Sequence, residues 1–118
     1  MDLAKLMKIQ ISADEKRGFA VKFDGDRERV RQLTKDLVGL FGEVGEFSNI
    51  LKKVDIKLDR PAYNGATLSE SRSQLGEELA DILIYLIRLA ATLEIDLEKE
   101  LVKKIKINKE RYKSLERD

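Results

Sequence analysis

Apolar side chains recur along this chain every three or four residues, which is the spacing of an amphipathic α-helix and not the alternation of a β-strand. A first helix is predicted over about residues 2–17, because its apolar residues share one face and Gly18 follows as a C-terminal cap. Asp24 or Asp26 is expected to cap a second helix, whose apolar positions continue to Val54.

The next segment, residues 55–69, breaks this pattern and is predicted to be a loop. It contains the single proline of the chain and an Asn-Gly pair at Asn64, both of which favour turns. Thr67 and Glu70 have the spacing of a capping box, so a third helix should begin there and continue to Leu93.

Asp96 can cap a fourth helix, which carries its apolar residues on one face as far as Tyr112. The four helices predict an all-α subunit that resembles an antiparallel four-helix bundle. The third helix is apolar almost all round, and a domain of this size cannot easily cover such a helix by itself. We therefore expect the subunit to dimerise through its helices.

The chain has 118 residues, the size of one domain, so residues 1–118 are expected to form a single domain. Its formal net charge of +1 provides no global attraction to a nucleic acid polymer or a membrane. The N-terminus is too charged for a signal peptide, and the longest apolar run, residues 82–87, is too short to span a bilayer. A cytoplasmic location is expected.

The chain contains neither cysteine nor histidine. Their absence removes the preferred ligands of zinc and copper, and it excludes catalysis by Ser-His or Cys-His pairs. Any metal must be held by oxygen ligands, which points to Mg²⁺, Mn²⁺ or Ca²⁺.

Two pairs of acidic residues lie three positions apart on the second and third helices, Glu43 with Glu46 and Glu78 with Asp81. Hydrophobic residues border each pair, so each is expected to face the interior of the bundle. Four converging carboxylates repel one another unless a divalent cation balances them. One such pair alone is usually a solvated face, whereas two pairs on separate helices favour a metal site.

Gly39, Gly42 and Gly45 follow the same three-residue spacing on the second helix. Each costs about 1 kcal/mol relative to alanine in a helix interior. A strip without side chains offsets this cost if a neighbouring helix or a ligand comes close to it. The strip is therefore expected beside the metal site.

A polar stripe is predicted on the fourth helix, where Lys104, Asn108 and Arg111 follow one another by four and three residues. It presents an ammonium, an amide and a guanidinium, which suit phosphate oxygens. The alternative is a solvated basic face on a terminal helix. Tyr85, one turn beyond Asp81, is either a core tyrosine or a ring on which a base stacks.

Three segments of the chain resemble the MazG-like all-α nucleoside triphosphate pyrophosphatases, in particular the dCTP pyrophosphatase type. The segment GEVGEFSNILKK resembles the Glu-x-x-Glu helix of this family, and GEELADILIYLIRLA resembles its Glu-x-x-Asp helix. The segment KIKINKERY resembles the Lys-x-x-x-Asn-x-x-Arg-Tyr stretch of its last helix. The likeness covers Val30 to Tyr112, and three motifs in order are more specific than either carboxylate pair alone.

The resemblance implies a Mg²⁺-dependent pyrophosphohydrolase, with Mn²⁺ as the alternative ion, that splits a (d)NTP into the (d)NMP and pyrophosphate. The implied metal ligands are Glu43, Glu46, Glu78 and Asp81. The implied substrate contacts are Tyr85, Lys104, Asn108, Arg111 and Tyr112. Glu46 and Glu77 are the candidates for the catalytic carboxylate that accepts the proton of water. Family members form dimers or pairs of dimers, so a homodimer or homotetramer that removes surplus or non-standard nucleotides is expected.

The sequence departs from the family pattern in two places. The stretch from Phe47 to Glu77 is longer than usual, so its loop is expected to be an insertion that reaches the active site or the partner subunit. Some relatives carry an aromatic residue that stacks on the base where this chain has Lys52 and Lys53. We expect Lys53 to contact the substrate, and the base preference stays open.

Two other functions fit the same residues. A regulatory helical bundle would retain the metal and nucleotide site but not the turnover. A helical assembly module would carry the carboxylates only as surface charge. Stabilisation of the fold by a divalent metal distinguishes the pyrophosphatase and the regulatory bundle from the assembly module.

Overall fold

The computed structural model describes residues 1–117 and is all-helical, as the sequence predicts. Its helices are α1 (Leu3–Lys16), α2 (Asp26–Asp59), α3 (Leu68–Thr92) and α4 (Leu97–Arg111), followed by the short 3-10 helix η1 (Lys113–Leu115). Within the described residues there is no β-strand, and none of the helices combines the length and the apolarity that crossing a bilayer requires.

Local capping signals explain where most of the helices begin. Asp2, Thr67 and Asp96 are the N-caps of α1, α3 and α4, and each side chain accepts a hydrogen bond from the backbone N–H three residues on. The capping box predicted at Thr67 is present. The predicted cap of α2 is wrong, because Gly25 occupies that position in an extended conformation. Asp26 is the first helical residue, where its charge interacts favourably with the helix dipole.

The second helix ends later than predicted. It continues to Asp59, so the loop comprises residues 60–67 rather than 55–69. Val54 is buried against the rest of the hairpin, and this packing favours continuation of the helix beyond it. The helix ends before Arg60, which has φ −132° and ψ 85°, because the proline that follows disfavours the helical conformation at this residue.

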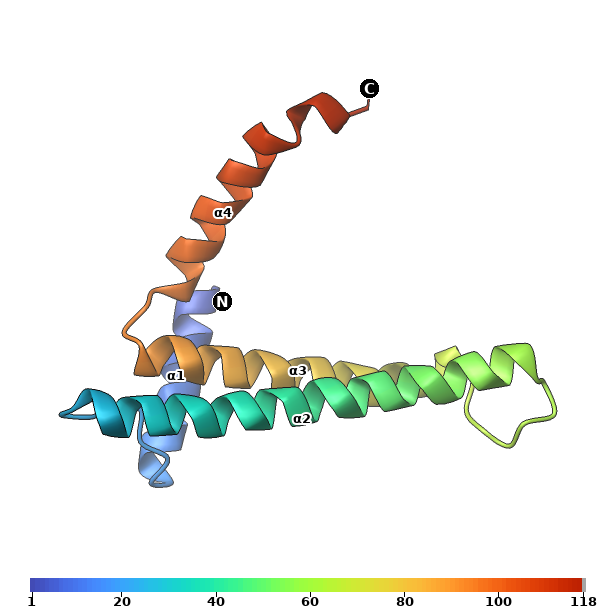
Figure 1. Cartoon of the computed structure of the whole chain (residues 1–118), viewed down its shortest axis with the longest axis horizontal. Coiled ribbons are helices and arrows are strands. Elements are labelled where there is room, and N and C mark those ends of the chain that lie inside the picture. The colour runs from blue at the N-terminus through green and yellow to red at the C-terminus, as the bar shows by residue number, and fades with distance from the viewer. Residues whose placement is uncertain (118) are drawn as a thin grey trace.

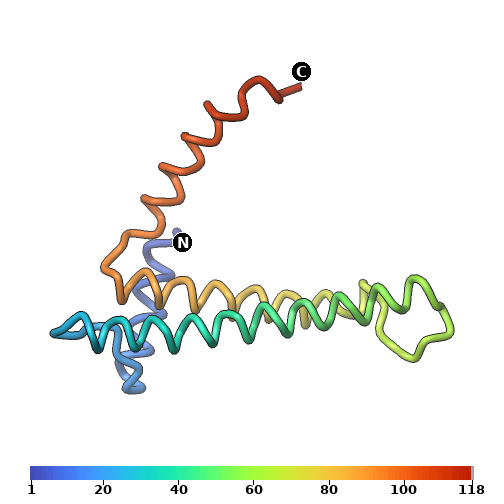
Figure 2. The backbone as a smooth tube through the Cα atoms, viewed as in Figure 1, coloured from blue at the N-terminus to red at the C-terminus, as the bar shows by residue number. Residues whose placement is uncertain are grey.

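Helices α2 and α3 form a long antiparallel hairpin, and the other two helices are attached near one of its ends (Figure 1). Loop 60–67 joins the two long helices at the opposite end. Helix α1 crosses the hairpin near the end of α3, and α4 extends away from the hairpin from the same region (Figure 1). The backbone trace in Figure 2 shows the same open arrangement.

The predicted four-helix bundle is not formed within one chain. Helix α4 contacts α1 at its base instead of packing along α2 and α3, and none of its residues is buried. The Cα radius of gyration is 18.4 Å, whereas a compact domain of this length has about 13.5 Å. The apolar face that the sequence predicts for α4 therefore has no covering partner within the described part of the chain.

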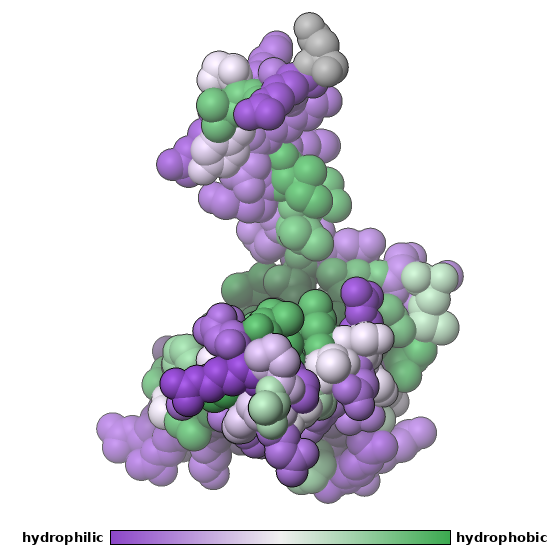
Figure 3. Space-filling model, turned by 90° about the vertical axis from the view of Figure 1, so that its right-hand side faces the viewer, coloured by the Kyte–Doolittle hydropathy of each residue, from purple (hydrophilic) through white to green (hydrophobic). Residues whose placement is uncertain are grey.

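The chain buries few of its hydrophobic side chains. The buried ones are Val21, Val54, Leu75, Ile87 and Ala90. Large apolar side chains remain exposed on the hairpin, among them Phe41 at 65% and Leu79 at 53%, and Figure 3 shows hydrophobic side chains at the surface. The accessible surface is 9393 Å², whereas a compact monomer of this mass exposes about 6,500 Å².

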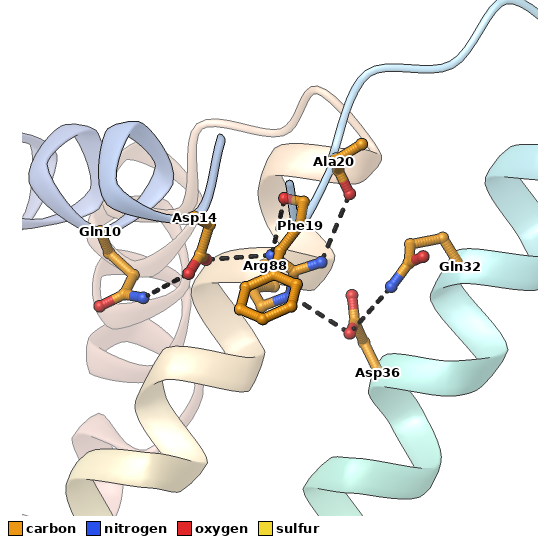
Figure 4. A network of polar contacts seen from close by, with 7 residues as sticks. All are labelled: Gln10, Asp14, Phe19, Ala20, Gln32, Asp36 and Arg88. Atoms are coloured by element: carbon orange, nitrogen blue, oxygen red, sulfur yellow. Dashed lines mark hydrogen bonds and ion pairs between the residues drawn. The ribbon is translucent and has the colours of Figure 1, made fainter. Parts of the chain in front are cut away.

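A buried ion cluster holds α1 against the hairpin (Figure 4). Arg88 of α3 donates from Nη1 to Oδ2 of Asp14 on α1 at 3.0 Å, and from Nε to Oδ1 of Asp36 on α2 at 3.2 Å. It also donates to the backbone oxygens of Phe19 and Ala20, between α1 and α2. Because buried charges without partners are costly, this cluster favours one arrangement of the three helices.

Candidate metal centre

Three glutamates from the two long helices meet along the hairpin. Glu43 and Glu46 lie three residues apart on α2, and Glu78 approaches them from α3. One carboxylate oxygen of each lies within 4.8 Å of those of the other two. The structure thus brings together three of the four carboxylates that the sequence predicts as metal ligands.

The proximity of these glutamates changes the protonation of Glu78. Its pKa is raised from 4.5 to about 7, first by the neighbouring carboxyl group of Glu43, then by desolvation, and further by the carboxyl group and charge of Glu46. Like charges this close oppose full ionisation of the group. Without a cation, the cluster therefore retains a proton up to about neutral pH.

The cluster has the donor set that a hard divalent cation requires. Oε2 of Glu43 and Oε2 of Glu78 are buried and have no hydrogen-bond partner. Buried oxygens without a partner are costly, and a cation would satisfy them while it displaces the proton. Mg²⁺ binds oxygen ligands and commonly keeps several waters, so three carboxylates are a sufficient contribution from the protein.

The two remaining acidic candidates lie beside the cluster. Asp81 follows Glu78 by three residues on α3, and its exposed side chain lines a pocket together with Glu43. Glu77 is exposed and lines neither of the two pockets that border the cluster. Successive helical residues point about 100° apart, so Glu77 and Glu78 face different directions.

Two pockets border the cluster. The larger has a volume of about 580 Å³ and extends from Glu46 and Glu78 to loop 60–67. The smaller has a volume of about 360 Å³ and extends from Glu43 to Arg88 and α1. Each pocket is therefore lined by at least one of the glutamates.

Two predicted substrate residues line different pockets. Lys53 of α2 lines the larger pocket, and Tyr85 of α3 lines the smaller one. The ring of Tyr85 lies against Gly39, where a β-carbon would overlap it. Of the predicted glycine strip, Gly39 therefore serves a close approach of the two helices, whereas Gly42 and Gly45 face open space.

The polar stripe of the last helix lies apart from the cluster in a single chain. Lys104, Asn108 and Arg111 share one helix, α4, which extends away from the hairpin (Figure 1). Neither these residues nor Tyr112 line the two pockets beside the cluster. The guanidinium carbon of Arg111 lies 5.3 Å from the ring centroid of Tyr112, which is a cation–π contact.

The larger pocket also contains side chains that the sequence analysis did not identify. Asn49 lies three residues after Glu46 on α2, and Gln74 lies four residues before Glu78 on α3. Helical spacing from the glutamates would have identified both. Tyr63 comes from the loop, whose course no periodicity predicts.

This chain is similar to known proteins. A model of the MazG-like family matches residues 46–118. The chain is 40% identical over 88 residues to dCTP pyrophosphatase 1 of Homo sapiens, and 37% identical over 87 residues to the protein of the same name from Rattus norvegicus. Each of these alignments covers 74% of this chain and 49% of the relative. The Gene 37 protein of Mycobacterium phage L5 is 34% identical over 71 residues, which is 60% of this chain and 58% of that protein. The chain thus spans about half the length of the dCTP pyrophosphatases that it matches.

Proposed function

Because this chain belongs to the MazG-like family, we propose that it is a metal-dependent nucleotide pyrophosphatase that hydrolyses a (d)NTP to the (d)NMP and pyrophosphate. The observation that carries the proposal is the meeting of Glu43, Glu46 and Glu78 between two pockets. The similarity to proteins named dCTP pyrophosphatase 1 supports a nucleotide as the substrate. The volume of the larger pocket, about 580 Å³, is in the range of small-molecule sites.

The proposed cofactor is Mg²⁺, with Mn²⁺ as the alternative. Glu43, Glu46 and Glu78 would hold it, and Asp81 is the proposed fourth carboxylate. When bound, the ion supplies positive charge against phosphate oxygens and lowers the pKa of water. The buried oxygens without hydrogen-bond partners on two of these glutamates support this assignment.

A carboxylate is the proposed proton acceptor, because the chain has no histidine. Glu46 is better placed than Glu77, since its exposed side chain lines the larger pocket beside the other two glutamates. The oxygen of water bonds to phosphorus while the bond between the α- and β-phosphates breaks and pyrophosphate leaves. Lys53, further along the same pocket, is a proposed substrate contact.

A homodimer or homotetramer is the proposed assembly, in which α4 of one copy completes the site of another. The large accessible surface and the exposed apolar side chains support it, because stable interfaces bury about 800 Å² of each partner. Helix α4 extends away from its own hairpin. The residues that would contact the triphosphate at the glutamates of a neighbouring copy are Lys104, Asn108, Arg111 and Tyr112.

The proposed role is the removal of surplus or non-standard (d)NTPs in the cytoplasm. The assay is a screen of common and damaged (d)NTPs for pyrophosphate release, with Mg²⁺ and Mn²⁺ tested separately. We expect pyrophosphate and the monophosphate from at least one nucleotide. Glu43→Gln should lower kcat/KM at least about 100-fold, because even loss of an outer partner of a metal ligand can cost that much.

The matched control is Glu28→Gln, an exposed glutamate in the first turn of the same helix, which should keep the parent activity. Absence of pyrophosphate with every nucleotide, or full activity of Glu43→Gln, would contradict the proposal. Tight nucleotide binding without any product would instead identify a regulatory bundle.

A further inference from the structure

The larger pocket follows one face of each long helix from the glutamates to the loop. Glu46, Asn49 and Lys53 share a face of α2, because they are spaced three and four residues apart. Glu78 and Gln74 share a face of α3 for the same reason. Seven residues separate Glu46 from Lys53, so the pocket is about 10 Å long along the helix axis. This length is comparable with the reach from the α-phosphate of a nucleotide to its base.

Loop 60–67 lines one end of this pocket and is held to the end of α2. Lys57 donates from Nζ to the backbone oxygens of Pro61 at 2.8 Å and of Tyr63 at 2.9 Å. The backbone N–H of Tyr63 donates to the oxygen of Arg60 at 2.8 Å. A β-carbon at Gly65 would lie 2.6 Å from Cε1 of Tyr63, so the half-buried ring rests on a position that only glycine leaves open.

The two pockets differ in the polar groups that they offer to a ligand. In the smaller pocket, the guanidinium of Arg88 is already paired with Asp14 and Asp36. The larger pocket has four amide or ammonium side chains that make no hydrogen bond or ion pair with the described part of the chain. These are Asn49, Lys53, Asn64 and Gln74. The larger pocket therefore has more unused hydrogen-bonding capacity for a substrate.

We propose that the larger pocket receives the nucleoside end of the substrate, and that Tyr63 is a specificity-determining residue against whose ring the base packs. Lys57 is a positioning residue, since it acts only through the loop. The inference rests on the proposed function, which places the triphosphate at the glutamates. An aromatic ring beside amide side chains suits a base, because a base has a face that stacks and an edge that forms hydrogen bonds.

The experiment measures the binding of non-hydrolysable α,β-imido (d)NTPs to the full chain by calorimetry, in the presence of Mn²⁺. Tyr63→Ala should weaken binding about 5- to 150-fold, the usual contribution of one stacked base, and should reduce the differences between bases. Tyr63→Phe should bind as the parent does. Lys57→Met should weaken nucleotide binding, and Lys57→Arg should restore part of it.

Two controls separate a local effect from a change in the fold. Affinity for Mn²⁺ alone should stay unchanged in every variant, because none of the substituted side chains belongs to the glutamate cluster. Ala62→Ser changes an exposed loop neighbour that does not line the pocket, and it should leave nucleotide binding unchanged. In turnover assays, Tyr63→Ala should raise KM more than it lowers kcat.

Parent-like affinity and base ranking in Tyr63→Ala would overturn the inference and leave the pyrophosphatase proposal intact. A parallel loss of Mn²⁺ affinity would also overturn it, because Tyr63 would then act through the fold. So would a loss of binding in Tyr85→Ala alone, which would place the base in the smaller pocket. Binding that depends on Tyr63 but gives no turnover would support the inference and contradict the hydrolytic function. A parent chain that binds no nucleotide would contradict both.

Discussion

Removal of the Arg88 guanidinium should destabilise the fold strongly, because two buried carboxylates depend on it (Figure 4). In Arg88→Ala, Asp14 and Asp36 would stay buried without a cation, and the backbone oxygens of Phe19 and Ala20 would lose a donor. Loss of one partner from a buried ion pair costs about 3–5 kcal/mol. We expect the unfolding free energy of Arg88→Ala to fall by an amount in this range, because Arg88 is the ion-pair partner of both carboxylates.

This free energy corresponds to a large change in Tm. The unfolding entropy of a chain of 118 residues is about 0.25 kcal/mol/K, so the loss lowers Tm by about 12–20 °C. Thermal unfolding followed by far-ultraviolet circular dichroism measures the change in Tm. The parent and the variant are compared at the same protein concentration, because association would also shift Tm. The control is Lys22→Ala, whose ion pair with Glu15 is open to solvent and should contribute less than about 1 kcal/mol.

A triple variant tests whether unpaired charge is the cause. Replacement of a complete buried ion cluster by apolar residues is often neutral, so Arg88→Met with Asp14→Leu and Asp36→Leu should recover most of the lost stability. Two results would refute the reasoning. One is a Tm of Arg88→Ala within about 4 °C of the parent, and the other is a triple variant no more stable than Arg88→Ala.

Three further predictions concern protonation, helix contact and assembly. The pKa of the Glu78 carboxyl is about 7 in the folded chain and ordinarily 4.5. Between pH 4.5 and pH 7, the metal-free folded state therefore keeps a proton that the unfolded chain has already released. Unfolding free energy should therefore fall as pH rises from 4.5 to 7, and calorimetry should show Mg²⁺ affinity rising by up to about tenfold per pH unit over this window; two flat profiles would contradict this. Gly39→Ala should cost about 1–3 kcal/mol in urea unfolding because the new methyl group overlaps the ring of Tyr85, whereas Gly42→Ala faces open space and should gain up to about 1 kcal/mol. Phe41→Glu places a charge on the exposed apolar surface and should lower the molecular mass in sedimentation; an unchanged oligomer would argue against this face as the interface.

The start of a helix could be predicted wherever a local hydrogen bond sets it. The caps at Thr67 and Asp96 are correct because each side chain bonds to an N–H three residues away. The end of α2 was predicted too early, because Val54 packs into the tertiary structure and the helix continues beyond it to Asp59. Local signals therefore identify the helices, whereas packing adjusts their length.

The candidate site was predictable only in part. Helical spacing places Glu43 beside Glu46 whatever the rest of the fold does. The rotation of α3 about its axis decides that Glu78 joins them while Asp81 lies at the smaller pocket. Tyr63 enters the larger pocket through loop hydrogen bonds that no periodic pattern indicates.

The sequence by itself determined the all-α class, the order of the helices and the acidic pairs, because helical hydrogen bonds and side-chain spacing act over three or four residues. The tertiary structure decided which faces meet. Arg88 pairs with residues 52 and 74 positions away, and α4 extends away from the hairpin instead of completing a bundle. An apolar stripe predicts that a face must be covered, but the partner that covers it depends on long-range packing, which a spacing of three or four residues does not encode.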